Sequence, residues 1–234
     1  MLWIVLGTIV VLLVLGLVVV PAALKPWQAR WGATDAEVIA ALPGDELVTD
    51  PQSVSTRAIT IDAPAETVYQ LVAQTGYKRA GWYGWDWFYN MTGSGDFVDG
   101  HYSTRIVPEL QGIKVGDKIF INPAVGYVVA RTEPAKAFVL LARGDTTKKT
   151  GGDIAPDAPF AAADRPAEYI NDSWAWIIQP ADGGKTRLIL RMRNDERGGT
   201  AIMSSLPLDF GSFLFASKTM VGIKNTAEAL AGTK

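Results

Sequence analysis

The sequence predicts an α+β fold in which a curved antiparallel β-sheet wraps around one long C-terminal helix, preceded by one transmembrane helix. Three observations predict this fold. Apolar residues recur every three or four positions through residues 206–230, which is the period of an amphipathic helix. Several segments between residues 55 and 193 alternate with a period of two, as strands do. Residues 2–24 contain no charged side chain.

The C-terminal helix is the element around which we expect the domain to be built. A helix over residues 206–230 would be roughly 36 Å long and would need a broad apolar surface to lie on. The opposite side carries small or polar residues that can face water or a close neighbour, among them Gly211, Lys218 and Gly222. The apolar stripe consists of Phe210, Phe213, Ala216, Met220, Ile223, Ala227 and Leu230.

Residues 1–24 are interpreted as a retained membrane anchor, because an uncharged segment of this length spans a bilayer core of about 30 Å. A cleaved signal peptide is the alternative. No Lys or Arg precedes the apolar run, however, and the run exceeds the usual length. Lys25 and Arg30 follow it, so the positive-inside rule places the domain in the cytoplasm, attached to the inner or plasma membrane by a single pass.

Residues 25–54 are expected to form a juxtamembrane linker with one short helix. Thr34 and Glu37 have the spacing of a capping box, in which each side chain bonds the backbone amide of the other residue. The helix should continue to about Leu42, because Pro43 and Gly44 then interrupt it.

Residues 55–232 are expected to form the folded domain. A first strand, 57–62, precedes a helix that Pro64 and Glu66 open and Gly76 closes. The further strands are 112–122, 126–132, 137–142, 169–179 and 186–193, the last two joined as a hairpin. Residues 145–168 have no period and are rich in Gly, Pro, Asp and Ala, which favours a loop; a lid over a cavity is the alternative.

Composition excludes several classes of function. A net charge of −2 gives no electrostatic footprint for nucleic acid. The chain has no cysteine and one histidine, His101, so thiolate chemistry and His-rich metal sites are absent. Nucleotide, hydrolase and metalloprotease motifs are also missing. We therefore assign no catalytic residue, no metal and no cofactor.

The order of elements, with the length of the last helix, resembles the helix-grip superfamily, which includes START-like lipid-binding domains and polyketide cyclases. The chain looks most similar to the bacterial SRPBCC, or polyketide cyclase-like, branch. The resemblance covers roughly residues 33–231 and implies a mostly apolar cavity between sheet and helix; the membrane segment departs from the soluble family norm. The matching segments are residues 59–76, 81–90, 106–119, 173–180, 186–193 and 207–224.

Aromatic residues supply most candidates for the wall of such a cavity, because their faces bury planar ligands well. Each group of candidates also has a structural alternative. The aromatic rings of residues 82–89 could instead plug the end of the core, and the two tryptophans of residues 173–180 could be ordinary core residues. The ligand-binding candidates are Trp82, Tyr83, Trp85, Asp86 and Tyr89, then Trp174 and Trp176, and Phe213 on the long helix.

A row of arginines on residues 186–193 supplies the charged candidates. Alternation places Arg187, Arg191 and Arg193 on one face of the strand. If that face points outward, the arginines form a solvated surface. If it faces the cavity, Arg191 and Arg193 need a carboxylate partner, such as Asp86 or Asp172 or an acidic ligand. Arg105 is a weaker candidate.

Three functions fit these observations. The first is a membrane-tethered domain that binds a hydrophobic or aromatic small molecule or lipid. The second is a non-catalytic accessory or structural subunit of a membrane protein complex. The third is a cyclase- or hydratase-like enzyme in which Tyr83, Asp86 and Arg191 orient the substrate.

Overall fold

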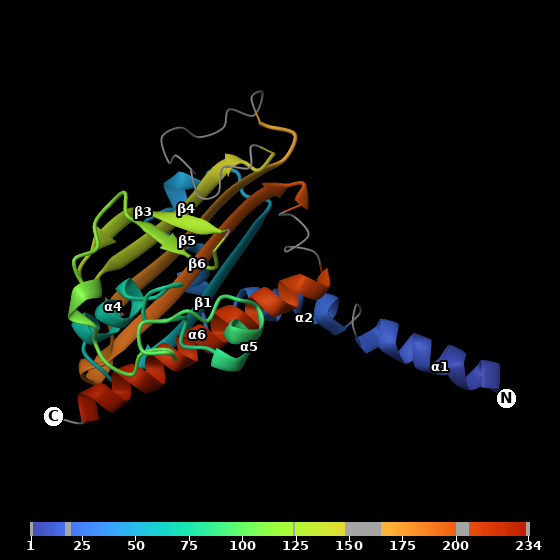
Figure 1. Ribbon diagram of the computed structural model, residues 1–234, viewed down its shortest axis with the longest axis horizontal. Coiled ribbons are helices and arrows are strands. Elements are labelled where there is room, and N and C mark those ends of the chain that lie inside the picture. The colour runs from blue at the N-terminus through green and yellow to red at the C-terminus, as the bar shows by residue number, and fades with distance from the viewer. Residues whose placement is uncertain (1, 17–19, 124, 148–164, 200–205, 233–234) are drawn as a thin grey trace.

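The computed structural model describes residues 2–16, 20–123, 125–147, 165–199 and 206–232 (Figure 1). Six strands form one sheet in the order β1-β6-β5-β4-β3-β2, and every neighbouring pair is antiparallel. The long helix α6 runs beneath the sheet (Figure 1). The expected α+β architecture is therefore present, and it fits the helix-grip arrangement. The strands are β1 Ser53–Ile61, β2 Lys118–Phe120, β3 Gly126–Glu133, β4 Ala137–Asp145, β5 Tyr169–Pro180 and β6 Thr186–Arg197.

Strand β2 is much shorter than the strand expected over residues 112–122. Gly116 adopts a positive φ of 94°, and the Asp117 side chain accepts the Lys114 backbone N–H in a tight turn. The turn ends before Lys118, so only three residues pair with β3. Residues 148–164, most of the loop expected at 145–168, lie outside the described residues.

Helix α6, Leu206–Gly232, lies against the inner face of the sheet next to β1. Its apolar stripe is buried as the sequence predicts, with Ala216, Met220, Ile223 and Ala227 almost fully enclosed. Helix α4, Ala65–Ala73, packs on the same face beside α6. A short helix that the sequence does not predict, α5 (Asp86–Met91), also lies against α6.

The outer face of the sheet is covered by residues 32–48, which we call the strap. The strap contains helix α3, Asp35–Ile39, with the expected capping box between Thr34 and Glu37, and a 3-10 turn, Asp45–Leu47. The helix ends before Leu42, which instead packs on the sheet. Both faces of β4 and β5 are consequently buried, which places the strap in the folded domain and not in a free linker. The outer-face cluster consists of Leu42, Ala58, Ala137, Val139, Ala175, Ile177 and Ile189.

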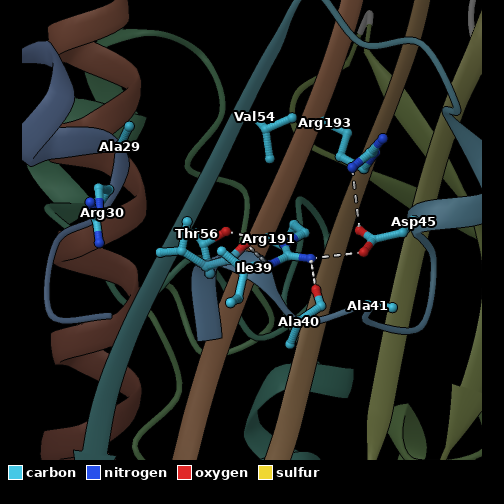
Figure 2. Close-up of a pocket in the computed structure, with 11 residues that line it drawn as sticks. Ala29, Arg30, Ile39, Ala40, Ala41, Asp45, Val54, Thr56, Arg191 and Arg193 are labelled. Carbon is cyan, nitrogen blue, oxygen red and sulfur yellow. Dashed lines mark hydrogen bonds and ion pairs between the residues drawn. The ribbon is translucent and has the colours of Figure 1, made fainter. Parts of the chain in front are cut away.

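The arginine row lies on this outer face, and the strap covers it (Figure 2). Arg191 donates to the backbone oxygens of Glu37, Val38 and Ala40 at 2.6–2.9 Å and pairs with Asp45 at 2.7 Å. Its partner is thus neither Asp86 nor Asp172, and the row is neither a solvated surface nor part of the inner face. Arg193 donates to the Val48 oxygen at 2.7 Å.

Arg187 holds the start of the strap in the same way. Its guanidinium donates to both carboxylate oxygens of Glu37, at 2.7 and 2.9 Å, and to the Gly32 oxygen at 2.6 Å. These bonds favour the charged carboxylate and lower the pKa of Glu37 to about 2. Arginine side chains therefore bind the strap at its beginning, middle and end.

The N-terminal segment forms two helices, α1 (Leu2–Val14) and α2 (Val20–Ala29); residues 17–19 of the expected anchor lie outside the described residues. Within the described ranges, no helix is both long and apolar enough to cross a membrane. Helix α2 packs on α6, where the rings of Trp27 and Phe213 lie 5.4 Å apart. Helix α1 extends away from the sheet (Figure 1).

Candidate functional site

An aromatic cluster fills the space between the inner face of the sheet and α6. We define the inner cluster as Trp82, Tyr89, Tyr127, Trp174 and Phe215. Their ring centroids lie 4.9–6.2 Å apart, from 4.9 Å between Tyr127 and Trp174 to 6.2 Å between Trp82 and Trp174. The residues come from the loop before α5, from α5, from β3 and β5, and from α6. Five parts of the chain thus meet around one group of rings.

Three tryptophans in this interior have unpaired indole N–H groups. The Nε1 atoms of Trp82, Trp174 and Trp176 are buried, and none has a hydrogen-bond partner among the described residues. A buried donor without a partner costs about 1–3 kcal/mol, and native proteins rarely leave several together. The arrangement therefore supplies several donors to any acceptor that enters the interior.

Tyr83 is also fully buried, but its hydroxyl is used structurally. It accepts the Gln74 side-chain amide at 2.7 Å, and burial raises the pKa of Tyr83 well above its usual range. The same amide donates to the Arg105 backbone oxygen, and its oxygen accepts the Val107 backbone N–H. Gln74 thus fixes the loop that follows Arg105 to the end of α4.

Two carboxyl groups lie together on the inner face: Asp172, which is buried two residues before Trp174 on β5, and Glu196 of β6, which is half-buried. Asp172 shares a hydrogen bond with Glu196 of β6. The pKa of Asp172 is raised well above its usual range, mainly by burial and in addition by the neighbouring Glu196 carboxyl. The Asp195 backbone N–H donates to Asp172 at 3.2 Å. Burial, with these two carboxyl groups nearby, also raises the pKa of Tyr127. Asp172 therefore keeps its proton at a pH where an ordinary aspartate has lost it.

We expect Asp172→Asn to change how stability depends on pH. The pKa of Asp172 is higher in the folded state than in the unfolded chain, where it is about 3.9. The wild type therefore loses stability as the pH rises from the unfolded pKa to the folded one, because the folded state must then give up a proton that it binds more tightly. The amide cannot ionise. In urea titrations, the unfolding free energy of the variant minus that of the wild type should therefore increase as the pH rises above the unfolded pKa. Asp96→Asn, at an exposed carboxyl, is the control. A difference that stays level with pH would show that Asp172 ionises normally.

The structure brings together only part of the predicted ligand-binding set. Trp82, Tyr83, Tyr89, Trp174 and Trp176 belong to one buried core. The others lie elsewhere. Trp85 is exposed on the outside of α5, and Asp86 accepts the Tyr102 backbone N–H. Arg105 is exposed and pairs with Asp99, Phe213 packs on α2, and Arg191 and Arg193 bind the strap. Tyr83, Asp86 and Arg191 do not converge on one point.

Tyr127, Asp172 and Glu196 are the inner-face residues absent from the predicted set. Alternation along β5 does contain the signal for Asp172, because it shares a face with Trp174 and Trp176. Glu196 lies beyond the expected end of its strand at residue 193, since β6 continues to Arg197. No local pattern marks Tyr127, whose strand is buried on both faces near its start.

Two pockets stand out in the described part of the chain, and neither is lined by residues of the inner cluster. One, of about 420 Å³, lies under the strap beside Arg191 and Arg193 (Figure 2). The other, of about 640 Å³, lies by Asp62, Lys185 and Lys224 near the C-terminal end of α6. Because the inner rings fill their space, a ligand between sheet and helix would have to displace some of them.

Comparison with known proteins yields no family. No protein-family model matches the chain, and no curated protein matches it. Similar solved structures include proteins from Nitrosospira multiformis (10% identity, 75% of this chain and 96% of that chain, TM-score 0.41) and Helicobacter pylori (10%, 80% and 95%, 0.43). A Mycobacterium smegmatis protein is 15% identical, with 76% of this chain and 89% of that chain covered and a TM-score of 0.38. The description of the fold therefore rests on the strand order and helices of this chain.

Proposed function

We propose that this chain binds an uncharged, largely apolar or aromatic small molecule between the inner face of the sheet and α6. The observation that carries the proposal is the group of unpaired indole donors on Trp82, Trp174 and Trp176. Binding sites for small molecules combine apolar and aromatic walls with a few fixed polar groups, and this interior has both.

The polar groups indicate the class of ligand. The indole N–H groups can only donate. A ligand with a carbonyl or ether oxygen satisfies them. An anionic ligand would bring its charge into this apolar interior without a cation to pair with among these groups, which is costly. The ligand is therefore a neutral hydrogen-bond acceptor on an apolar body, such as a quinone-like or isoprenoid compound.

We further propose that residues 2–24 hold the domain at a membrane, where such ligands reside. Helix α1 carries Trp3, Leu6 and Leu12 with large exposed fractions, from 50% to 83%, and these side chains are more stable in lipid than in water. Residues 2–24 also contain no charged side chain. The orientation with the domain in the cytoplasm remains a prediction from Lys25 and Arg30.

Native mass spectrometry of the full chain, extracted gently from its own membranes, tests the ligand. We expect a constant extra mass of small-molecule size. Trp174→Phe keeps the ring but removes the donor, so it should weaken ligand retention by about 5- to 10-fold, the worth of one hydrogen bond. Trp87→Phe, on the exposed side of α5, should leave retention unchanged. Recovery of the bare polypeptide mass from wild type and both variants would overturn the proposal.

The second candidate is a non-catalytic accessory subunit of a membrane complex. The observation that favours it is the same exposed apolar surface of α1, which could pack on partner helices instead of lipid. In the same mass spectra, a stoichiometric set of other polypeptides without a small molecule would support this candidate against the first.

A further inference from the structure

The short helix α5 has apolar side chains on two opposite sides. Tyr89 points into the inner cluster, where it is almost fully buried. On the other side Trp87 is 64% exposed and Met91 is 70% exposed, with Phe88 also exposed. We call Trp87, Phe88 and Met91 the α5 face; Trp85, just before the helix, is partly exposed and lies beside α6. Clustered exposed apolar side chains of this size mark a surface that contacts something other than water.

The position of α5 indicates what it contacts. The Lys218 ammonium of α6 lies 5.8 Å from the Trp85 ring centroid, and Phe215 lies 6.2 Å from Tyr89. Trp27 of α2 packs on Phe213, only about 8 Å further along α6. Helix α5 is therefore near the end of the domain where α2 leads to α1, as Figure 1 also shows.

The composition of the α5 face suits a lipid surface. Tryptophan is stable at the level of lipid headgroups, since its ring is apolar and its N–H is polar, and Phe and Met enter the adjoining acyl region. Trp27, on the neighbouring α2, is also exposed. A cation over Trp85 adds a favourable charge next to phosphate groups.

We propose that the α5 face inserts into the headgroup region of the bilayer and holds the domain flat against the membrane. This inference rests on the proposed tether by residues 2–24, because the tether brings α5 within reach of lipid. The domain then has two contacts with the membrane, one through its N-terminal segment and one through α5.

The absence of cysteine in this chain makes a direct test possible, because one introduced cysteine carries a single spin label. The test site is Met91→Cys. The control is Val115→Cys, a position that is 61% exposed in the turn before β2, at the opposite edge of the sheet from β1. Each labelled full-length chain is reconstituted in vesicles of phosphatidylcholine and phosphatidylglycerol. Flotation and label collisions with oxygen and with a water-soluble nickel chelate are then measured.

We expect both proteins to float with the vesicles. The ratio of oxygen to nickel collisions should be several-fold higher at residue 91 than at residue 115, because oxygen concentrates in lipid and the nickel chelate stays in water. Floating protein with equal ratios at both sites would overturn the α5 contact while leaving the tether intact. Protein that does not float would overturn the tether and the α5 contact together. Shielding of residue 91 from both reagents would mean that a second copy or another protein, and not lipid, covers the α5 face.

Discussion

Replacement of Gly222 by alanine is expected to destabilise the domain by about 2–3 kcal/mol. A Cβ atom added at Gly222 would lie 1.9 Å from the Tyr83 backbone oxygen and 2.7 Å from the Tyr83 Cβ. The first contact is with backbone, and Tyr83 is fully buried with a positive φ of 54°, so the loop has little room to shift. Helix α6 must move away from the loop instead, which loosens the inner cluster.

Gly211 provides a matched control within the same helix. A Cβ atom there meets no other atom within 4 Å. Alanine is the better helix former, so Gly211→Ala should be neutral or raise the unfolding free energy by up to about 1 kcal/mol. Urea titration of both variants measures the difference. Equal effects at the two positions would show that α6 does not approach Tyr83 this closely.

The elements of the fold could be predicted from the sequence where one physical cause dominates. Helix α6 buries a single side, so the spacing of its apolar residues predicts both the helix and the residues that it buries. The strands that form β5 and β6 were recognisable because turn residues at 181–185 separate two segments with strong strand propensity. The length of β2 is overestimated from the sequence, which predicts a strand over residues 112–122. A turn at Gly116 divides this segment, although its composition otherwise resembles that of a strand.

The layer on the outer face could not be predicted from local periodicity. Alternation correctly grouped Arg187, Arg191 and Arg193, but it cannot decide which side of a sheet a row faces. The answer depends on the strap, whose residue Asp45 is 146 positions earlier in the chain than Arg191. One signal was available: the continuous apolar run in β4 is typical of a strand buried on both faces.

The aromatic segment 81–90 shows a similar limit. Gly81 and Tyr83 adopt positive φ angles and α5 begins at Asp86, so the direction of the side chains changes within a few residues. Trp82 and Tyr89 then face the inner cluster, while Trp87 faces outward. Neither a helical nor a strand period applies across such a segment, so composition identified its importance without dividing it into two surfaces.

Replacement of Arg191 by methionine is expected to cost about 3–5 kcal/mol, the range for removing one partner of a buried ion pair. Its side chain is only 3% exposed, and it makes hydrogen bonds to the Thr56 hydroxyl, to the Asp45 carboxylate and to backbone oxygens. Three of these oxygens belong to the C-terminal end of α3, where the last carbonyls of a helix lack intrahelical partners. Methionine fills similar space but leaves these oxygens without their donor, and leaves Asp45 with the Leu42 N–H and the more distant Arg193 only.

Arg131→Met is the control, because Arg131 also pairs with the strap, through Glu46 at 3.2 Å, but in an exposed position. An exposed pair contributes about 1 kcal/mol or less. Hydrogen exchange of the full chain should show faster exchange over residues 35–48 in Arg191→Met, with little change in β5 and α6, and near wild-type exchange in Arg131→Met. Similar small effects in both variants would show that apolar packing of Leu42 on Val139 and its neighbours is enough to hold the strap, and that the arginine only satisfies the polar groups it buries.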